Sequence, residues 1–164
     1  MKLPFFRQLQ VGDMRISIKV QTKIFDAASE ANTLRSGIAL TGALVEFTGF
    51  VRDVSEGSQV SAMYLEHYPG MTEKSLHNIA EQAISRWQVF GVSVIHRVGR
   101  LGPAEPIVYV AVIGEHRREA FEACEFIMDF LKKDAPFWKK EWNEKDEAQW
   151  VAAKESDESA VARW

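Results

Sequence analysis

Hydrophobic and polar side chains follow regular periods along most of this 164-residue chain. Met14–Val20 alternates strictly between apolar and polar residues, which predicts a half-buried β-strand because successive strand side chains face opposite ways. After the turn at Pro69–Gly70, apolar residues recur at the helical period and predict an amphipathic helix. Its predicted buried face consists of Leu76, Ile79, Ala80, Ala83, Ile84 and Trp87. A second long helix is predicted from His116 to about Lys133, ending before Pro136.

Shorter patterned segments complete the predicted set of elements. Asp26 is placed to cap a short helix that runs to about Leu34. The polar stretch Asp53–Gln59 contains Gly57 and is typical of a hairpin loop between two strands. The further predicted strands are Ala39–Val51, Val60–Glu66, Val92–Val98, Ile107–Ile113, Phe137–Trp142 and Gln149–Ala153.

The order of these elements predicts an α+β fold with a largely antiparallel sheet. The length suits one domain, residues 1–164, that is large enough to bury a hydrophobic core. The last stretch, Lys154–Trp164, is mostly polar. We expect it to be mobile or loosely docked, because a segment this polar buries little apolar area.

Composition narrows the possible functions. Hydrophobic residues make up 46% of the chain and charged residues 26%, as in soluble globular proteins. The net charge of −3 gives no whole-protein positive field for nucleic acid. No apolar run is long enough to span a bilayer, and Met1–Arg7 is too short for a signal peptide, so a cytoplasmic location is the default expectation.

Metal and cofactor chemistry finds no support in the motifs. The single Cys124 excludes an internal disulfide and a cysteine-based zinc site. It lies on the apolar face of the second long helix, which predicts a small buried hydrophobe rather than a reactive thiolate. The four histidines show no metal spacing, and the glycine-rich phosphate loop and the GxSxG and HExxH patterns are missing. We therefore expect no metal and no cofactor.

The segment Phe126–Glu141 is the main candidate for chemistry. Two lysine pairs, Lys132–Lys133 and Lys139–Lys140, flank the rigid corner Pro136–Trp138. Such a cluster can hold an anion such as phosphate. The alternative is a solvated basic helix end, which suits the negative end of the helix dipole, and the segment alone favours this alternative.

Other cations are placed near predicted element ends. His116, Arg117 and Arg118 stand at the start of the second long helix, where free N–H groups attract anions. These three residues are equally compatible with an anion-binding site and with an exposed, charged helix cap. Arg52 ends a strand beside a polar loop, a position that slightly favours simple exposure to water. His96 lies inside a predicted strand and favours a structural role.

Five motifs that occur in a fixed order indicate a protein family, which the local patterns do not. The chain closely resembles the MoaE family, the large (catalytic) subunit of molybdopterin synthase, from about Thr41 to its C-terminus. The motifs that carry the resemblance are Phe47–Arg52, Leu65–Met71, His96–Gly99, His116–Arg117 and Ala135–Glu141. The His-Tyr-Pro-Gly-Met and Ala-Pro-Phe-Trp-Lys runs are the specific ones. Phe50 departs from some relatives, which have a lysine there.

The resemblance implies a fold, an activity and partners. The fold is an α/β hammerhead with an additional antiparallel β subdomain. The reaction converts cyclic pyranopterin monophosphate to molybdopterin by inserting two sulfurs as a dithiolene. The sulfur arrives as a thiocarboxylate on the C-terminal glycine of a small ubiquitin-like (MoaD-type) subunit. Two large subunits form a central homodimer within a heterotetramer.

The resemblance also assigns roles to residues of this chain. Lys132 and Lys139 are the expected catalytic residues, which stabilise charge and protonate a leaving oxygen. The expected substrate-binding residues are Arg52, His116, Arg117, Lys139, Lys140 and Glu141. His116 and Arg117 are expected to reach the site from the neighbouring subunit. Two alternatives remain: a non-catalytic protein that docks a ubiquitin-like partner, and a phosphate-ester binder of another kind.

Overall fold

The computed structural model describes residues 14–164 except 56–57, 144 and 152–154. The helices are α1 (Ala27–Arg35), α2 (Met71–Trp87), α3 (Arg117–Asp134) and α4 (Glu155–Val161). The strands are β1 (Arg15–Gln21), β2 (Ala43–Phe50), β3 (Val54–Ser55), β4 (Ser58–His67), β5 (Gly91–Arg97), β6 (Gly99–Leu101), β7 (Pro106–Gly114), β8 (Phe137–Asn143) and β9 (Ala148–Val151). No helix in this part of the chain is long and apolar enough to cross a membrane.

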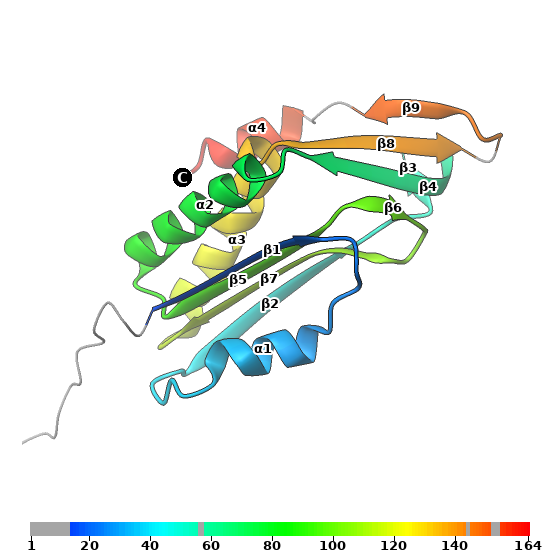
Figure 1. Cartoon of the computed structure of the whole chain (residues 1–164). Coiled ribbons are helices and arrows are strands. Elements are labelled where there is room, and N and C mark those ends of the chain that lie inside the picture. The colour runs from blue at the N-terminus through cyan, green and yellow to red at the C-terminus, as the bar shows by residue number, and fades with distance from the viewer. Residues whose placement is uncertain (1–13, 56–57, 144, 152–154) are drawn as a thin grey trace, which may run out of the picture.

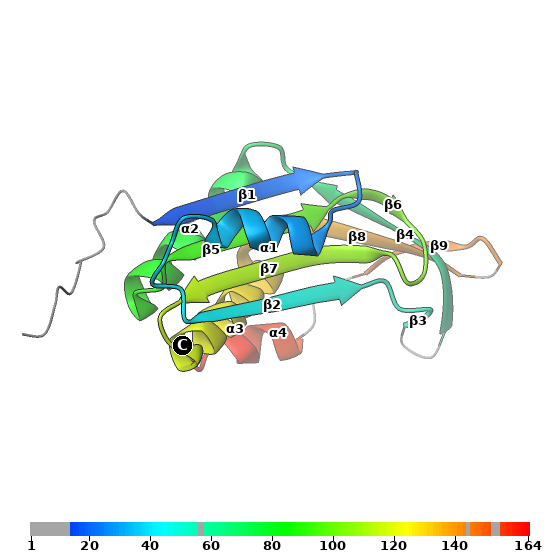
Figure 2. The same ribbon diagram turned by 90° about the horizontal axis from the view of Figure 1, so that it is seen from below.

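The main sheet has the strand order β1-β5-β7-β2 (Figure 1). β1 runs parallel to β5, and the other pairs are antiparallel. α2 and α3 cover one face of the sheet and α1 covers the other, as the two views in Figures 1 and 2 show. β5 and β7 are therefore buried on both faces, which explains why their sequences are nearly continuous apolar runs rather than alternating ones.

A second sheet contains β3, β4, β8 and β9, with β6 paired to the other side of β4. It packs against the end of the main sheet through a small apolar core. That core, here called the inter-sheet core, consists of Val51, Met63, Leu65, Val98 and Leu101. The predicted α+β fold with largely antiparallel strands is confirmed, and the second sheet matches the additional antiparallel subdomain that the resemblance implies.

Some strand ends differ from the predicted ones. The strand expected from Ala39 begins at Ala43, because the chain first makes a turn in which Thr41 N–H donates to the Ile38 carbonyl at 3.2 Å. A side chain at Gly42 would overlap the backbone of Glu115, so only glycine allows this close approach. The hairpin loop predicted at 53–59 is confirmed by the pairing of β3 with β4, although its tip lies outside the described residues.

The C-terminal segment packs on α2 and α3, except for Lys154, which lies outside the described residues. α4 is followed by Trp164, whose ring meets the rings of Trp87 and Phe126 edge to face at 5.5 and 5.7 Å. The Trp164 indole N–H donates to Asp129 at 2.8 Å, and Arg163 pairs with the same carboxylate at 2.7 Å. The segment is polar on average, but its two terminal side chains supply the docking contacts.

Removing Ser156–Trp164 is accordingly expected to destabilise the fold. The deletion uncovers Trp87 and Phe126 and leaves Asp129 without two of its partners. We expect the free energy of unfolding to fall by about 2–4 kcal/mol, measured by urea denaturation. Trp138→Ala is a suitable control, because that indole is largely exposed and its loss should change stability much less. Equal stability of the full and shortened chains would contradict the docked arrangement.

Candidate functional site

Lys139 and Glu141 lie on the inner face of β8. Lys139 is paired with Leu65 across the β4–β8 ladder, and Glu141 with Met63. Directly paired residues share a face, so both side chains point toward the inter-sheet core. Glu141 is only 7% exposed, and its carboxylate is paired with the Lys139 ammonium at 2.9 Å. Because a buried carboxylate is costly without a cation, this pair fixes where the Lys139 ammonium lies.

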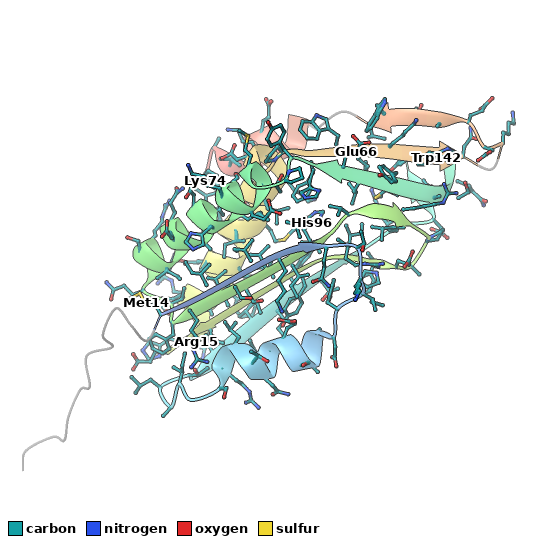
Figure 3. The ribbon with its side chains drawn as sticks, viewed as in Figure 1. Met14, Arg15, Glu66, Lys74, His96 and Trp142 are labelled. Carbon is teal, nitrogen blue, oxygen red and sulfur yellow. The ribbon has the colours of Figure 1, made fainter. Side chains whose placement is uncertain are left out.

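Lys140 lies on the opposite, outer face of the same strand. Its ammonium is 5.3 Å from the ring centroid of Trp142 and 5.5 Å from that of Trp150, which are cation–π contacts. Figure 3 shows Trp142 on β8. Within one copy, Lys139 and Lys140 therefore face opposite sides of β8, because neighbouring residues of a strand alternate.

Lys132 reaches the same region from α3. It lies exposed in the last turn of the helix, two residues before Asp134 ends it. Ala135 then adopts an extended backbone, and the Phe137 N–H donates to the Ala135 carbonyl at 2.9 Å to make a tight corner. The chain enters β8 directly afterwards, so the helix-end lysine and the strand lysine flank one corner.

Arg52 follows the end of β2 and lies near the start of β4, since the Val60 N–H donates to the carbonyl of the next residue, Asp53, at 2.7 Å. The preceding Val51 is buried in the inter-sheet core with Leu65, and its N–H donates to the Glu105 carbonyl at 2.9 Å. The buried backbone therefore fixes where the exposed Arg52 side chain leaves the core. We use the name lysine corner for the four residues of one copy that are expected to act together: Arg52, Lys132, Lys139 and Glu141.

The loop that holds Val51 is itself tied down by a buried arginine. Arg97 is 6% exposed and donates to Glu105 at 3.3 Å, to the Pro106 carbonyl at 3.0 Å and to the Thr22 carbonyl at 3.2 Å. Glu105 in turn accepts the Gly102 N–H. The sequence carries no local signal for this arrangement, since Arg97 and Glu105 stand in different elements.

His116 and Arg117, here called the distal pair, lie at the other end of α3. Arg117 precedes Lys132 by 15 residues. At ~1.5 Å per residue, the two Cα positions are about 22 Å apart along the helix. Both side chains of the pair are exposed, and His116 is the N-cap residue without a side-chain capping bond. One copy of the chain therefore presents two separate cationic clusters instead of one complete site.

Two buried titratable groups have clear structural roles. Burial raises the pKa of the Cys124 thiol to about 12, which fits the predicted inert hydrophobe. His96 is 6% exposed, and burial lowers its pKa from 6.5 to about 4, so the ring is neutral near pH 7. Its Nδ1–H donates to the Arg97 carbonyl at 2.9 Å. Figure 3 shows His96 between the two sheets.

The neutral His96 makes stability sensitive to acid. Between pH 6.5 and about 4 the unfolded chain protonates this histidine and the folded chain does not. The unfolded state then binds more protons, so stability decreases as the pH falls through this window, by about 3 kcal/mol at its lower end. His96→Phe should flatten the stability–pH curve, measured by denaturation at several pH values, whereas His77→Phe, at an exposed site, should not. Identical acid profiles for His96→Phe and wild type would contradict this assignment.

Comparisons with known proteins identify the family of this chain. A family model described as MoaE protein matches residues 10–134. The molybdopterin synthase catalytic subunit of Ralstonia nicotianae is 55% identical over 148 residues, which cover 90% of this chain and 84% of the relative. The protein of the same name from Cereibacter sphaeroides is 54% identical over 147 residues, covering 90% and 99%.

Solved structures give the same result for the fold. The molybdopterin biosynthesis MoaE protein from Burkholderia ambifaria superimposes with a TM-score of 0.79 at 49% identity, covering 91% of this chain and 97% of the other. Molybdopterin synthase from Staphylococcus aureus gives a TM-score of 0.76 at 29% identity, covering 82% and 96%. These likenesses confirm the resemblance inferred from the five sequence motifs, and the chain belongs to the MoaE family.

Proposed function

We propose that this chain is the catalytic, sulfur-transferring subunit of molybdopterin synthase. It moves two sulfurs to cyclic pyranopterin monophosphate, one from the C-terminal thiocarboxylate of each of two small ubiquitin-like subunits, and forms the dithiolene of molybdopterin. Each spent tail leaves as an ordinary carboxylate. The observation that carries the proposal is the buried ion pair of Lys139 with Glu141, on the strand that follows the Lys132 end of α3, within a MoaE-family fold. A cytoplasmic location, expected from the sequence, is part of the proposal.

The chemistry of the corner suits this reaction. The substrate carries a cyclic phosphate and the incoming tail is a thiocarboxylate, so both reactants are anions. The Arg52 guanidinium offers directional hydrogen bonds to a phosphate. Lys132 and Lys139 stabilise the negative charge that develops during attack by the thiocarboxylate sulfur, and they supply a proton to the leaving oxygen. Glu141 keeps the Lys139 ammonium in place. The buried Cys124 thiol fits sulfur delivery by the partner rather than by a cysteine of this chain.

We propose further that the site is shared between two copies of the chain. β2 pairs only with β7 among the described residues, so its outer edge is open. β2 begins beside the start of α3 and runs in the same direction, toward the lysine corner. If two β2 edges met antiparallel around a two-fold axis, the distal pair of each copy would lie beside the lysine corner of the other. Exposed apolar side chains near this edge supply surface for such a contact: Leu44, Phe47, Phe50 and Phe121.

A reconstituted assay tests the activity directly. The chain is mixed with a thiocarboxylated small subunit and cyclic pyranopterin monophosphate, and the dithiolene product is measured. We expect product with the thiocarboxylated tail and none with the same subunit ending in an ordinary carboxylate. Tight binding of the small subunit without product would instead identify a protein that only docks its partner.

A further inference from the structure

Residues from three separate parts of the chain meet at the corner between Lys132 and Lys139. Thr72 comes from the first turn of α2, His96 from β5, and Pro136 with Phe137 from the link between α3 and β8. Figure 1 shows the beginning of α2 beside the end of α3 and the beginning of β8. The proposed chemistry uses Lys132 and Lys139, on either side of this link, and assigns no role to the residues that hold it.

Thr72 joins α2 to the corner through its hydroxyl group. The hydroxyl donates to the Pro136 carbonyl at 3.2 Å and accepts the N–H of Tyr68 at 3.0 Å. Thr72 is 0% exposed, so water cannot replace either bond. The bond to Pro136 spans 64 residues of sequence and fixes one of the two peptide carbonyls that lie between the end of α3 and the first residue of β8.

The ring of His96 holds the other side of the corner. It stacks on Phe137 with a centroid distance of 3.8 Å and an interplanar angle of 20°. Phe137 also packs against the inter-sheet core. Because this stack fixes Phe137, the Thr72 bond to Pro136 determines how the corner turns. The turn of the corner in turn places Lys132 relative to Lys139.

We propose that Thr72 is a positioning residue for sulfur transfer, because its hydroxyl sets the spacing of Lys132 and Lys139. The effect on sulfur transfer rests on the proposed function. The placement of the two lysines rests on the hydrogen bonds of Thr72 alone. Thr72 itself lies behind the corner and touches neither reactant. A misplacement of reacting groups by ~1 Å can lower a rate by on the order of 100-fold.

Substitutions at Thr72 distinguish the effect of its side-chain shape from the effect of its hydroxyl group. Thr72→Val keeps the branched shape and removes both hydrogen bonds, and we expect it to lower kcat by roughly 10- to 100-fold with little change in the KM for the pyranopterin. Thr72→Ser keeps the hydroxyl and should restore most of the rate. Ser61→Ala removes hydroxyl bonds to the far end of β8, at Trp142 and Asn143, and should leave kcat unchanged. Ile79→Val lowers stability from within the same helix and should also leave kcat unchanged.

A double-variant comparison distinguishes positioning from general damage. In a Lys139→Ala background the lysine spacing is already lost, so Thr72→Val should reduce the residual rate by less than threefold. An equal fold-loss in both backgrounds, or a folded Thr72→Val protein with a wild-type kcat, would overturn the proposal.

A measurement without turnover separates this inference from the proposed function. The ammonium signal of Lys139, observed by NMR with 15N-labelled lysine, reports its ion pair with Glu141. Thr72→Val should shift or broaden that signal, and Ser61→Ala should not. A shifted signal together with an inactive wild-type protein would contradict the proposed function and leave the positioning role supported. An unchanged signal in Thr72→Val would overturn the positioning role.

Discussion

Lys132→Ala is expected to lower the single-turnover rate of sulfur transfer by on the order of 100- to 1,000-fold while the protein stays folded. The side chain is exposed in the last turn of α3 and, among the described residues, has no ion-pair partner whose loss would destabilise the helix. Its removal takes away charge stabilisation only where negative charge develops in the transition state. The measurement is a rapid-quench single-turnover assay with thiocarboxylated small subunit, supported by a thermal melt.

The adjacent lysine provides a matched control. Lys133 lies in the same last turn, is equally exposed and contributes the same charge near the helix C-terminus. Its side chain points about 100° away around the helix axis, so Lys133→Ala should keep most of the rate. Lys139→Ala should also be impaired, though less than Lys132→Ala. A Lys132→Ala protein with a near-normal rate would remove this lysine from the reaction.

Mixed dimers of two inactive variants are expected to regain activity. An Arg117→Ala chain keeps its lysine corner and loses part of its distal pair. A Lys132→Ala chain keeps its distal pair and loses part of its lysine corner. If each site combines the lysine corner of one copy with the distal pair of the other, every mixed dimer contains one intact site. After exchange at equal concentrations, roughly a quarter of the wild-type number of sites should be intact. The activity of the mixture is compared with that of each parent alone.

The mixing experiment needs a check that subunits exchange. Differently tagged chains and native mass spectrometry show the fraction of mixed dimers directly. A mixture of Arg117→Ala with a Lys132→Ala,Arg117→Ala double variant is the control, because no combination of those chains gives an intact site. Verified mixed dimers that remain as inactive as both parents would exclude a shared site.

Local periodicity in the sequence was sufficient to predict most of the elements and their buried faces. The helical spacing after Pro69–Gly70 predicted α2, and five of its six expected core residues are buried in the structure. The position of Cys124 on the apolar face of α3 was enough to predict an inert thiol. The ordered motifs predicted the MoaE family, which the comparisons confirm. These features depend on side chains that are neighbours in sequence or on the order of motifs, and both can be read without a fold.

The tertiary structure decided which of those side chains work together. It placed Lys139 with the buried Glu141 and turned Lys140 to the aromatic outer face, because the register of β4 and β8 defines the faces. It docked Trp164 onto α2 and α3, and it separated the distal pair from the lysine corner by most of a helix. The hydroxyl of Thr72 meets Pro136 across 64 residues. Such contacts join segments distant in sequence, and a periodic pattern specifies that a face is buried but not which partner covers it.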